Sequence, residues 1–470
     1  MNFAVLMLAA IAGLSATAAP EMAAPEAAPP LDRAHRADNT ELAGYIEEAV
    51  ARNPELQALH ARWLAALQRV PQARSLDDPM FRFSYFVKSP GKDFQLVLGQ
   101  TFPWFGTLRA RADEAAHEAE AAFARMLVAR NRIVLDTKLA YYELAALDAT
   151  ESILEAESAL RGELEKLARE RYALGMEMQD DVLRLENERE SQYDQLLSLR
   201  ERRPSVAAAL NEAAGRDLLA EVAPPSEIEA PPAPPEAPDI AALIQRMHPE
   251  LRELEALADA AAAGVVVARK MGYPEIALET MYEFGRNPGS AGMDPLAPGR
   301  IGTYRRLAET ALGRTPFNPA DTAMDLYDLG YRESMKAEDE WSITLGLSLP
   351  IWRKKVRAGV AEAEQEVRAI EFEQAAVRRR LEREVHGALF RMRDAERQYR
   401  LVRERLHPTA ARTTAIVRER YASGDLDTVL AEVLMATGDE FAIDRMGVEL
   451  LRAWRSASAE VEFLLGGPWE

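Results

Sequence analysis

The chain contains one pattern of residues twice, and this internal repeat restricts the fold more than any other feature. Residues 101–115 read TFPWFGTLRARADEA, and residues 348–364 read SLPIWRKKVRAGVAEAE. In both, an alternating apolar segment meets a proline, bulky side chains, basic residues and a long segment rich in Ala, Glu and Arg. The repetition predicts that a strand passes into a long helix at two places in one fold.

Other landmarks recur in the same order around both copies. A helical pattern opening with NPEL (53–56) or HPEL (248–251) precedes each copy, and RYALG (171–175) or RYASG (420–424) follows it. Arg171 follows Pro103 by 68 positions, and Arg420 follows Pro350 by 70. The matching spacing indicates a duplicated unit, and the second copy carries an insertion between its two predicted strands, at 285–339.

Four segments alternate between apolar and other residues over lengths typical of strands. The predicted strands cover 81–88, 93–102, 275–284 and 340–349, with aromatic residues such as Phe81, Phe102 and Trp341 near their ends. At about 3.3 Å per residue, nine residues span roughly 30 Å, the thickness of a bilayer core. No apolar run after the N-terminus is long enough for a membrane-spanning helix, so strands would have to cross any membrane.

Two long helices are predicted at 104–171 and 351–420, with Pro408 as a point of kinking. Each is followed by a short tip, at 172–179 and 421–427, and then by a returning helix. Gly175 and Gly424 are suited to left-handed C-terminal caps, and Asp180 and Asp427 to N-terminal caps of the returning helices.

The character of the remaining segments is predicted from their composition. Residues 1–18 have the apolar core and small-residue end of a signal peptide, although they lack a basic residue. Residues 19–39 are expected to be disordered. Repeat 1 covers 40–203, a proline-rich linker covers 204–238, and repeat 2 covers 239–466.

Composition argues against several classes of function. The net charge of -19 is the opposite of a nucleic-acid-binding footprint, and the absence of cysteine excludes disulfides and thiolate sites. The six histidines lack metal-binding spacing. Five of them are expected on helix surfaces: His60, His117, His248, His386 and His407. Sixteen methionines are dispersed, as core residues usually are. We therefore expect no enzyme, no cofactor and no metal site.

The paired order of these motifs resembles the TolC-type outer-membrane efflux proteins over nearly the whole mature length. The resemblance rests on FPWFG and LPIW at strand ends and on RYALGMEMQDDVL and RYASGDLDTVLAEVL at the tips. It implies a mainly α fold with a transmembrane β-barrel. Three chains would close twelve strands above a long α-helical coiled-coil tunnel.

The resemblance also implies a place and partners. The protein would lie in the outer membrane of a Gram-negative bacterium, in contact with its lipid, with a large periplasmic portion. It would bind a periplasmic adaptor protein and an inner-membrane pump, and nucleic acid is not an expected partner.

Site residues are carried over from the family by position. The barrel–tunnel junction would contain Pro103, Trp104, Phe105, Pro350, Ile351 and Trp352. Adaptor contacts at the tips would come from Arg171, Tyr172, Gly175, Met176, Asp181, Arg420, Tyr421, Gly424 and Leu426. The periplasmic entrance would contain Glu432, with Met435 at the position where the family can have a second acid.

Three functions share this pattern. The first is a passive efflux conduit for metal cations or small toxic compounds. The DPM…FPWFG motif is most similar to the heavy-metal efflux branch of the family. The second is an outer-membrane duct for type I protein secretion, which uses the same architecture. The third is a non-conducting periplasmic coiled-coil scaffold, against which the membrane-length apolar strand faces argue.

Overall fold

The computed structural model describes residues 40–87, 92–176, 178–225, 228–231, 240–285, 298–312, 314, 321–322, 324–325, 340–423 and 430–467. The predicted signal peptide (1–18), the segment 19–39, most of the insertion and the second tip from Gly424 to Asp427 lie outside these residues. The chain divides into two compact units. A helical unit comprises residues 1–69, 115–260 and 366–470, and a sheet unit comprises 70–114 and 261–365.

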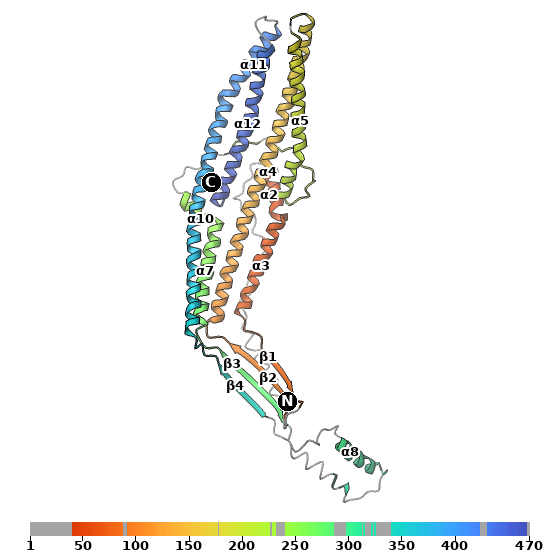
Figure 1. The fold of residues 1–470 in the computed structure, drawn as a ribbon, viewed down its shortest axis with the longest axis vertical. Helices are drawn as coiled ribbons and strands as arrows, with labels where there is room; N and C mark the ends of the chain where they lie inside the picture. The colour runs from red at the N-terminus through yellow and green to blue at the C-terminus, as the bar shows by residue number, and fades with distance from the viewer. Residues whose placement is uncertain are drawn as a thin grey trace. The chain divides into compact units, whose positions relative to one another are not determined.

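The sheet unit contains four strands in the order β1-β2-β3-β4, all antiparallel (Figure 1). Their bounds are β1 (Met80–Tyr85), β2 (Lys92–Phe102), β3 (Ile276–Gly285) and β4 (Glu340–Leu347). A helix within the insertion, α8 (Pro298–Ala311), lies between β3 and β4 in sequence. Each predicted strand is present, because alternation of apolar and polar residues is compatible with a strand and not with a helix.

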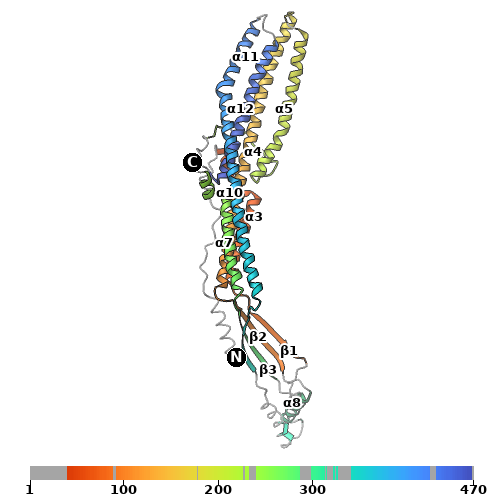
Figure 2. The same ribbon diagram turned by 60° about the vertical axis from the view of Figure 1, so that its left-hand side comes forward.

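Helices account for the other described elements. They are α2 (Thr40–Arg52), α3 (Pro54–Arg74), α4 (Thr107–Ala173), α5 (Gln179–Ala213), α6 (Ile240–Met247), α7 (Pro249–Lys270), α10 (Arg353–Leu401), a π-helix (Val402–Leu406), α11 (His407–Ala422) and α12 (Leu430–Leu465). In the helical unit, α4 lies beside α5, and α11 lies beside α12 (Figures 1 and 2).

Small residues allow the long helices to approach closely. Helix α4 has 67 residues and no internal proline. Its buried alanines recur every two to four residues, and their small side chains let neighbouring helices come close. In the first third of the helix these are Ala110, Ala112, Ala115, Ala119, Ala121 and Ala124.

The helix expected at 351–420 contains a local change of winding. A π-helix covers Val402–Leu406, and the backbone N–H of His407 donates to Val402 O, five residues earlier. Pro408 follows directly, near the start of α11. Because proline has no N–H and its ring clashes with the preceding turn, a π-bulge at this point accommodates it. The predicted irregularity at Pro408 takes this form.

Helix α5 continues beyond the expected end of repeat 1 at residue 203. It includes Pro204 and ends at Ala213. The arginines before the proline pair with acids on α4: Arg203 donates to both oxygens of Asp148 at 2.8 and 3.0 Å, and Arg200 donates to Glu151 at 2.7 Å. Proline usually ends a helix at the residue before it. These ion pairs with α4 stabilise α5 around Pro204, so the helix continues.

The two NPEL and HPEL motifs start helices in the same way. The Oδ1 atom of Asn53 accepts a hydrogen bond from the N–H of Glu55 at 2.9 Å. The Nδ1 atom of His248 accepts one from the N–H of Glu250 at 3.3 Å. Both side chains therefore satisfy a backbone donor in the first turn of a helix.

The expectation that His248 lies on a helix surface is wrong. Its side chain is 2% exposed and packs edge-on against Phe463. Burial lowers its pKa from 6.5 to about 4, with a smaller effect from Arg380 in the same direction, while Glu250 opposes the change. The folded protein keeps the imidazole neutral. This contribution to stability is present above pH 6.5 and is lost as the pH falls towards 4.

Substitutions at His248 test the cap. We expect His248→Ala to be less stable than His248→Asn by about 1 kcal/mol, because asparagine restores a side-chain acceptor and alanine does not. Both variants also lose packing, so the difference between them isolates the cap. The measurement is urea unfolding at pH 7.5, followed by circular dichroism. Equal stability of the two variants would show that the His248 hydrogen bond contributes nothing.

Candidate functional site

The register of the sheet places most apolar residues of the four strands on one face. Phe83 pairs with Leu96, Leu96 with Tyr282, and Tyr282 with Trp341, so one row crosses the whole sheet. Residues two positions away form parallel rows on the same face, because side chains alternate along a strand. The predicted alternation is therefore in register across strands that are distant in sequence, since Phe83 and Trp341 are 258 positions apart.

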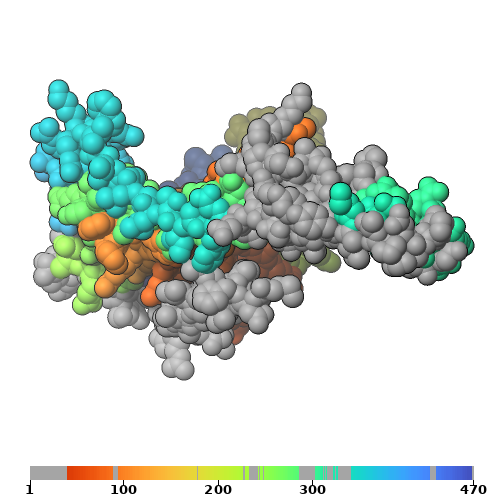
Figure 3. Space-filling model, turned by 90° about the horizontal axis from the view of Figure 1, so that it is seen from below, coloured from red at the N-terminus to blue at the C-terminus, as the bar shows by residue number. Residues whose placement is uncertain are grey.

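This apolar face is open to the surroundings. Its side chains on the outer strands are more than half exposed: Phe81, Phe83, Tyr85, Trp341, Ile343, Leu345 and Leu347. Figure 3 shows cyan residues of β4 and the start of α10 beside orange residues of β2 and the start of α4. A contiguous exposed apolar surface of this kind marks an interaction site with a membrane or another protein.

The opposite face is polar and less exposed at its centre. It contains Gln95, Thr101, Glu279, Glu283, Ser342 and Thr344, together with the apolar Val97, which the sequence indicates as an exception, and its partner Met281. Glu283 is 5% exposed and Val97 is 6% exposed. A water-soluble sheet would bury its apolar face, whereas this sheet leaves its apolar face exposed.

Both predicted junction prolines lie just after strands: Pro103 directly follows β2, and Pro350 comes shortly after the end of β4 at Leu347. After β2, the chain turns at Gly106, whose φ of 81° requires a residue without a Cβ. Trp104 stacks on Tyr273 with ring centroids 5.5 Å apart, and Lys270 Nζ donates to Phe105 O at 3.1 Å. The other bulky junction residues expose most of their side-chain surface: Phe105, Ile351 and Trp352. Pro103 and Pro350 are half-buried.

The first tip has the backbone geometry that its glycine predicts. Gly175 has a φ of 74°, and the N–H of Met176 donates to Arg171 O at 2.9 Å, which closes a Schellman motif. The prediction that Asp180 caps α5 is wrong, because Met178 is the N-cap and supplies no side-chain hydrogen bond. Asp180 and Asp181 lie in the first turn, where carboxylates favour the helix dipole.

The tip residues differ in exposure. Tyr172 and Met176, together with neighbouring Leu174 and Met178, have exposed apolar side chains. Arg171 and Tyr421 are instead buried, at 9% and 1% exposure. The sequence indicates both as adaptor contacts, but in this chain they contact each other. Arg420 is exposed, while Gly424 and Leu426 lie outside the described residues.

Arg171 joins the two repeats near the tips. Its Nη1 donates to Tyr421 O at 3.0 Å, and its guanidinium carbon lies 4.4 Å from the centre of the Tyr421 ring. A groove of about 350 Å³ lies between α4 and α11 beside this contact. The groove is lined by Leu160, Glu163, Leu164, Leu167, Ala415, Arg418, Glu419, Tyr421 and Ala422.

The two predicted entrance residues lie on one exposed side of α12. Glu432 is in the first turn, and Met435, three positions later, is 64% exposed. Val433 and Leu434 are buried in a cluster with Tyr421. The packing of these two residues orients α12, so Glu432 and Met435 point away from the helical core.

A chain of buried ion pairs joins α4 to α5 and α12, and sequence reasoning missed it. Glu157, 2% exposed, accepts hydrogen bonds from Arg161 at 2.8 Å and from Arg445 of α12. Arg161 also pairs with Glu188 of α5. The spacing of Glu157 and Arg161 is the only local signal of this cluster.

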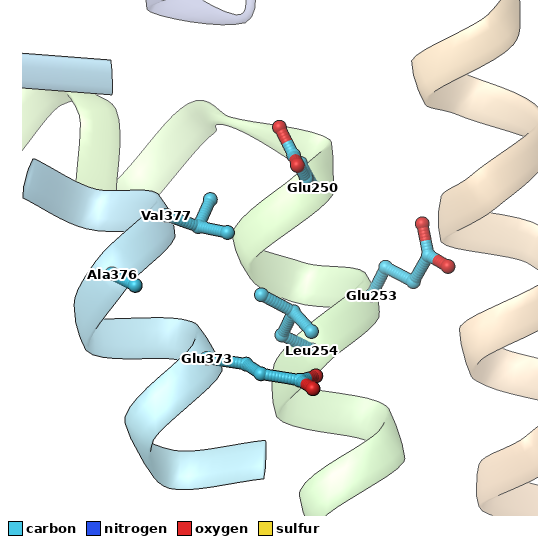
Figure 4. Close-up of a pocket in the computed structure, with 6 residues that line it drawn as sticks. All are labelled: Glu250, Glu253, Leu254, Glu373, Ala376 and Val377. Atoms are coloured by element: carbon cyan, nitrogen blue, oxygen red, sulfur yellow. The ribbon is translucent and has the colours of Figure 1, made fainter. Parts of the chain in front are cut away.

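A second hollow lies between α7 and α10 and has a volume of about 270 Å³ (Figure 4). Its three carboxylates belong to Glu250, Glu253 and Glu373. Arg380 pairs with Glu250, and Arg125 pairs with Glu253 at 2.7 Å, so two of them are already neutralised. In the described ranges, no group of three His, Cys, Asp or Glu residues is arranged to hold a metal ion.

None of the described helices is both long enough and apolar enough to span a membrane. No curated protein matches the sequence at a significant level.

Several solved structures share the fold. The outer-membrane channel OprN is 17% identical, with a TM-score of 0.69 over 92% of this chain and 91% of that chain. VceC from Vibrio cholerae, an outer membrane protein, is 21% identical, with a TM-score of 0.68 over 92% and 97%. CusC, studied for transmembrane channel formation, is 16% identical, with a TM-score of 0.70 over 92% and 93%.

The sequence itself matches the family model described as outer membrane efflux protein over residues 45–216 and 241–467. These ranges include all four strands, the long helices, both sides of the tips and the exposed side of α12. The chain belongs to the outer membrane efflux protein family.

Proposed function

We propose that this protein is the outer-membrane channel of a tripartite efflux system. It would be a passive conduit from the periplasm to the exterior for substrate delivered by an inner-membrane pump and a periplasmic adaptor. The observation that carries the proposal is the four-stranded sheet with an exposed, mainly apolar face that is aligned across its strands. That face is suited to lipid, and the polar face behind it is suited to a water-filled lumen.

The edges of the sheet support a closed ring of chains. Among the described residues, β1 pairs only with β2 and β4 only with β3. In lipid, each unpaired backbone group costs several kcal/mol, so β1 of one chain would pair with β4 of the next. Three chains would give twelve strands, whereas two would give eight, whose interior side chains fill. The homotrimer is thus the smallest ring of whole chains with an open lumen.

The tips are the proposed adaptor site. Tyr172, Leu174, Met176 and Met178 expose apolar side chains at the first tip. Tyr421, which contacts Arg171, lines the groove between α4 and α11. Apolar side chains grouped beside a groove are suited to binding a helix of another protein. Arg171 and Tyr421 would position this surface from below and would not contact the adaptor themselves.

The proposed cargo consists of metal cations or small toxic compounds. The polar face of the sheet carries three carboxylates, Glu279, Glu283 and Glu340, and one cation, Arg82. A lumen with this excess of negative charge would favour cations over anions. Protein secretion through the same architecture remains the alternative, and transport assays with a matched pump distinguish the two.

Extraction of the envelope fraction with urea tests the proposal. An integral channel would stay in the membrane pellet, and the purified protein would conduct ions in a planar bilayer. Release into the supernatant would indicate a peripheral scaffold and would contradict the proposal.

Cross-linking then tests the ring. The chain has no cysteine, so pairs of introduced cysteines in β1 and β4 report only on the intended contact. Under the proposed closure, the best pair gives a covalent trimer and no larger species.

Substitution of Glu432 tests the entrance. Three copies of this exposed carboxylate would form a ring that attracts cations, so Glu432→Gln should lower the preference for K⁺ over Cl⁻ in bilayer recordings. Glu201→Gln, which removes an exposed carboxylate from α5, is the control and should leave selectivity unchanged. Equal selectivity of the Glu432→Gln variant and the wild type would exclude the ring.

A further inference from the structure

Three of the four connections between strands and long helices have the same order of residue types. From strand to helix, β2–α4, β3–α7 and β4–α10 each pass from alternating apolar residues to bulky side chains and then to basic residues. The fourth connection, α3–β1, differs, because Asp77 and Asp78 lie between Arg74 and the strand. An order that occurs three times, in segments from both repeats, calls for a common physical cause.

Direct contacts join the three similar connections into one surface. Trp104 stacks on Tyr273, and Lys270 Nζ donates to Phe105 O at 3.1 Å. Arg353 Nη1 in turn donates to Gly272 O at 3.1 Å. Figures 1 and 2 both show these connections at the same end of the sheet. We name residues 104–111, 269–273 and 351–357 the basic–aromatic surface.

The charge of the basic–aromatic surface is opposite to that of the whole chain. It contains eight Lys and Arg residues and no Asp or Glu, in a protein of net charge -19. Two of the cations have carboxylate partners: Arg269 pairs with Glu364 at 2.9 Å, and Arg109 lies 4.0 Å from Asp113. Among the described residues, Arg111, Lys354 and Lys355 have no carboxylate partner.

Large aromatic side chains surround these cations. Their exposure is unfavourable in water and favourable at a membrane surface. Phe105 and Trp352 are 78% and 74% exposed. Aromatic rings concentrate at the level of lipid headgroups, and long cationic side chains beside them reach the phosphates. Arg109 lies in the first turn of α4, and Arg353, Lys354 and Lys355 lie in the first turn of α10. The helix dipole favours anions at these positions, so an external anion would offset an unfavourable placement of the cations.

We propose that the basic–aromatic surface binds the phosphates of anionic phospholipids on the helix side of the membrane. The inference rests on the proposed membrane function and deepens it by naming a lipid class. The exposed apolar face of the sheet would contact acyl chains, Phe105 and Trp352 would lie at the boundary, and Arg111, Lys354 and Lys355 would face the headgroups. Charge complementarity selects anionic over zwitterionic lipid at about fivefold per cation.

Lipid retention tests the proposal. The full-length protein is reconstituted in vesicles of phosphatidylcholine alone or mixed equally with phosphatidylglycerol, and urea extraction measures insertion in each. It is then solubilised, and the lipids that copurify are quantified by mass spectrometry. We expect enrichment of phosphatidylglycerol with the wild type and a roughly 25-fold smaller enrichment with Lys354→Gln/Lys355→Gln, since two cations are lost.

Two control variants separate specific binding from net charge and from misfolding. Lys166→Gln/Arg184→Gln removes two exposed cations from the helical unit and should keep the enrichment. Lys354→Arg/Lys355→Arg keeps the charge and should keep it too. An equal loss in the Lys166→Gln/Arg184→Gln variant would overturn the proposal, since net charge alone would then explain it.

The outcomes also separate this proposal from the membrane function. Insertion in both vesicle types with no enrichment of phosphatidylglycerol would overturn the lipid preference alone. The cations would then be assigned to the binding of an acidic protein partner. Release of the wild type by urea from both vesicle types would overturn the membrane function and the lipid preference with it.

Discussion

Replacement of Leu345 by arginine is expected to remove the protein from the urea-resistant membrane fraction. Leu345 lies in the second half of β4, is 72% exposed and pairs with Leu278 on the apolar face. An arginine on the lipid face of a spanning strand costs about 2–4 kcal/mol near the middle of the bilayer. In the proposed trimer the cost occurs three times, so most of the protein should appear in the supernatant.

The adjacent residue provides a matched control. Thr344 lies on the polar face of the same strand and pairs with Glu279, so Thr344→Arg places the same charge beside a carboxylate. This variant should stay in the membrane pellet at the wild-type level. If both variants behaved alike, the two faces of the sheet would not differ in environment, and the assignment of the apolar face to lipid would be wrong.

Loss of the carboxylate of Glu157 should produce the largest destabilisation in the helical unit. Glu157→Ala leaves Arg161, 12% exposed, and Arg445, 33% exposed, without their shared partner. Breaking a buried ion pair by removing one partner costs about 3–5 kcal/mol, and the partial exposure of Arg445 favours the lower value. The midpoint of thermal unfolding of the detergent-solubilised protein, followed by circular dichroism, measures the effect.

Glu155 on the same helix is the comparison. It pairs with Arg200 and is half exposed, so Glu155→Ala should cost less than about 1 kcal/mol. Equal shifts in the two midpoints would show that burial of Glu157 adds nothing. A second variant, Glu157→Leu/Arg161→Met, replaces the inner pair by apolar groups and should recover part of the loss.

The repeated architecture could be predicted because its signals are local and periodic. The alternation in β4, from Trp341 to Leu347, is compatible only with a strand that has two different faces. Gly175 follows a helical pattern directly, and it adopts the left-handed conformation that such a position favours. The strand and helix predictions need no knowledge of distant residues, and for this reason they agree with the structure.

Contacts between distant segments could not be predicted in this way. Arg171 and Tyr421 belong to matching motifs in the two repeats, but only the fold reveals that the arginine of one contacts the tyrosine of the other. Glu157 and Arg445 are 288 positions apart, and many other pairs of acidic and basic residues have similar patterns. His248 is a polar residue at the start of a helical pattern, which predicts an exposed position. In the fold it is buried, because it packs against Phe463.

The open edges of the sheet have a consequence for the time course of assembly. A lone chain that entered a bilayer would expose one side of β1 and of β4, and lipid offers these peptide groups no hydrogen bonds. Under the proposed closure, association must therefore precede insertion or accompany it. The rate of insertion should then rise more steeply than linearly with the concentration of chains, and dilution should delay it more than it delays the folding of α4 against α5.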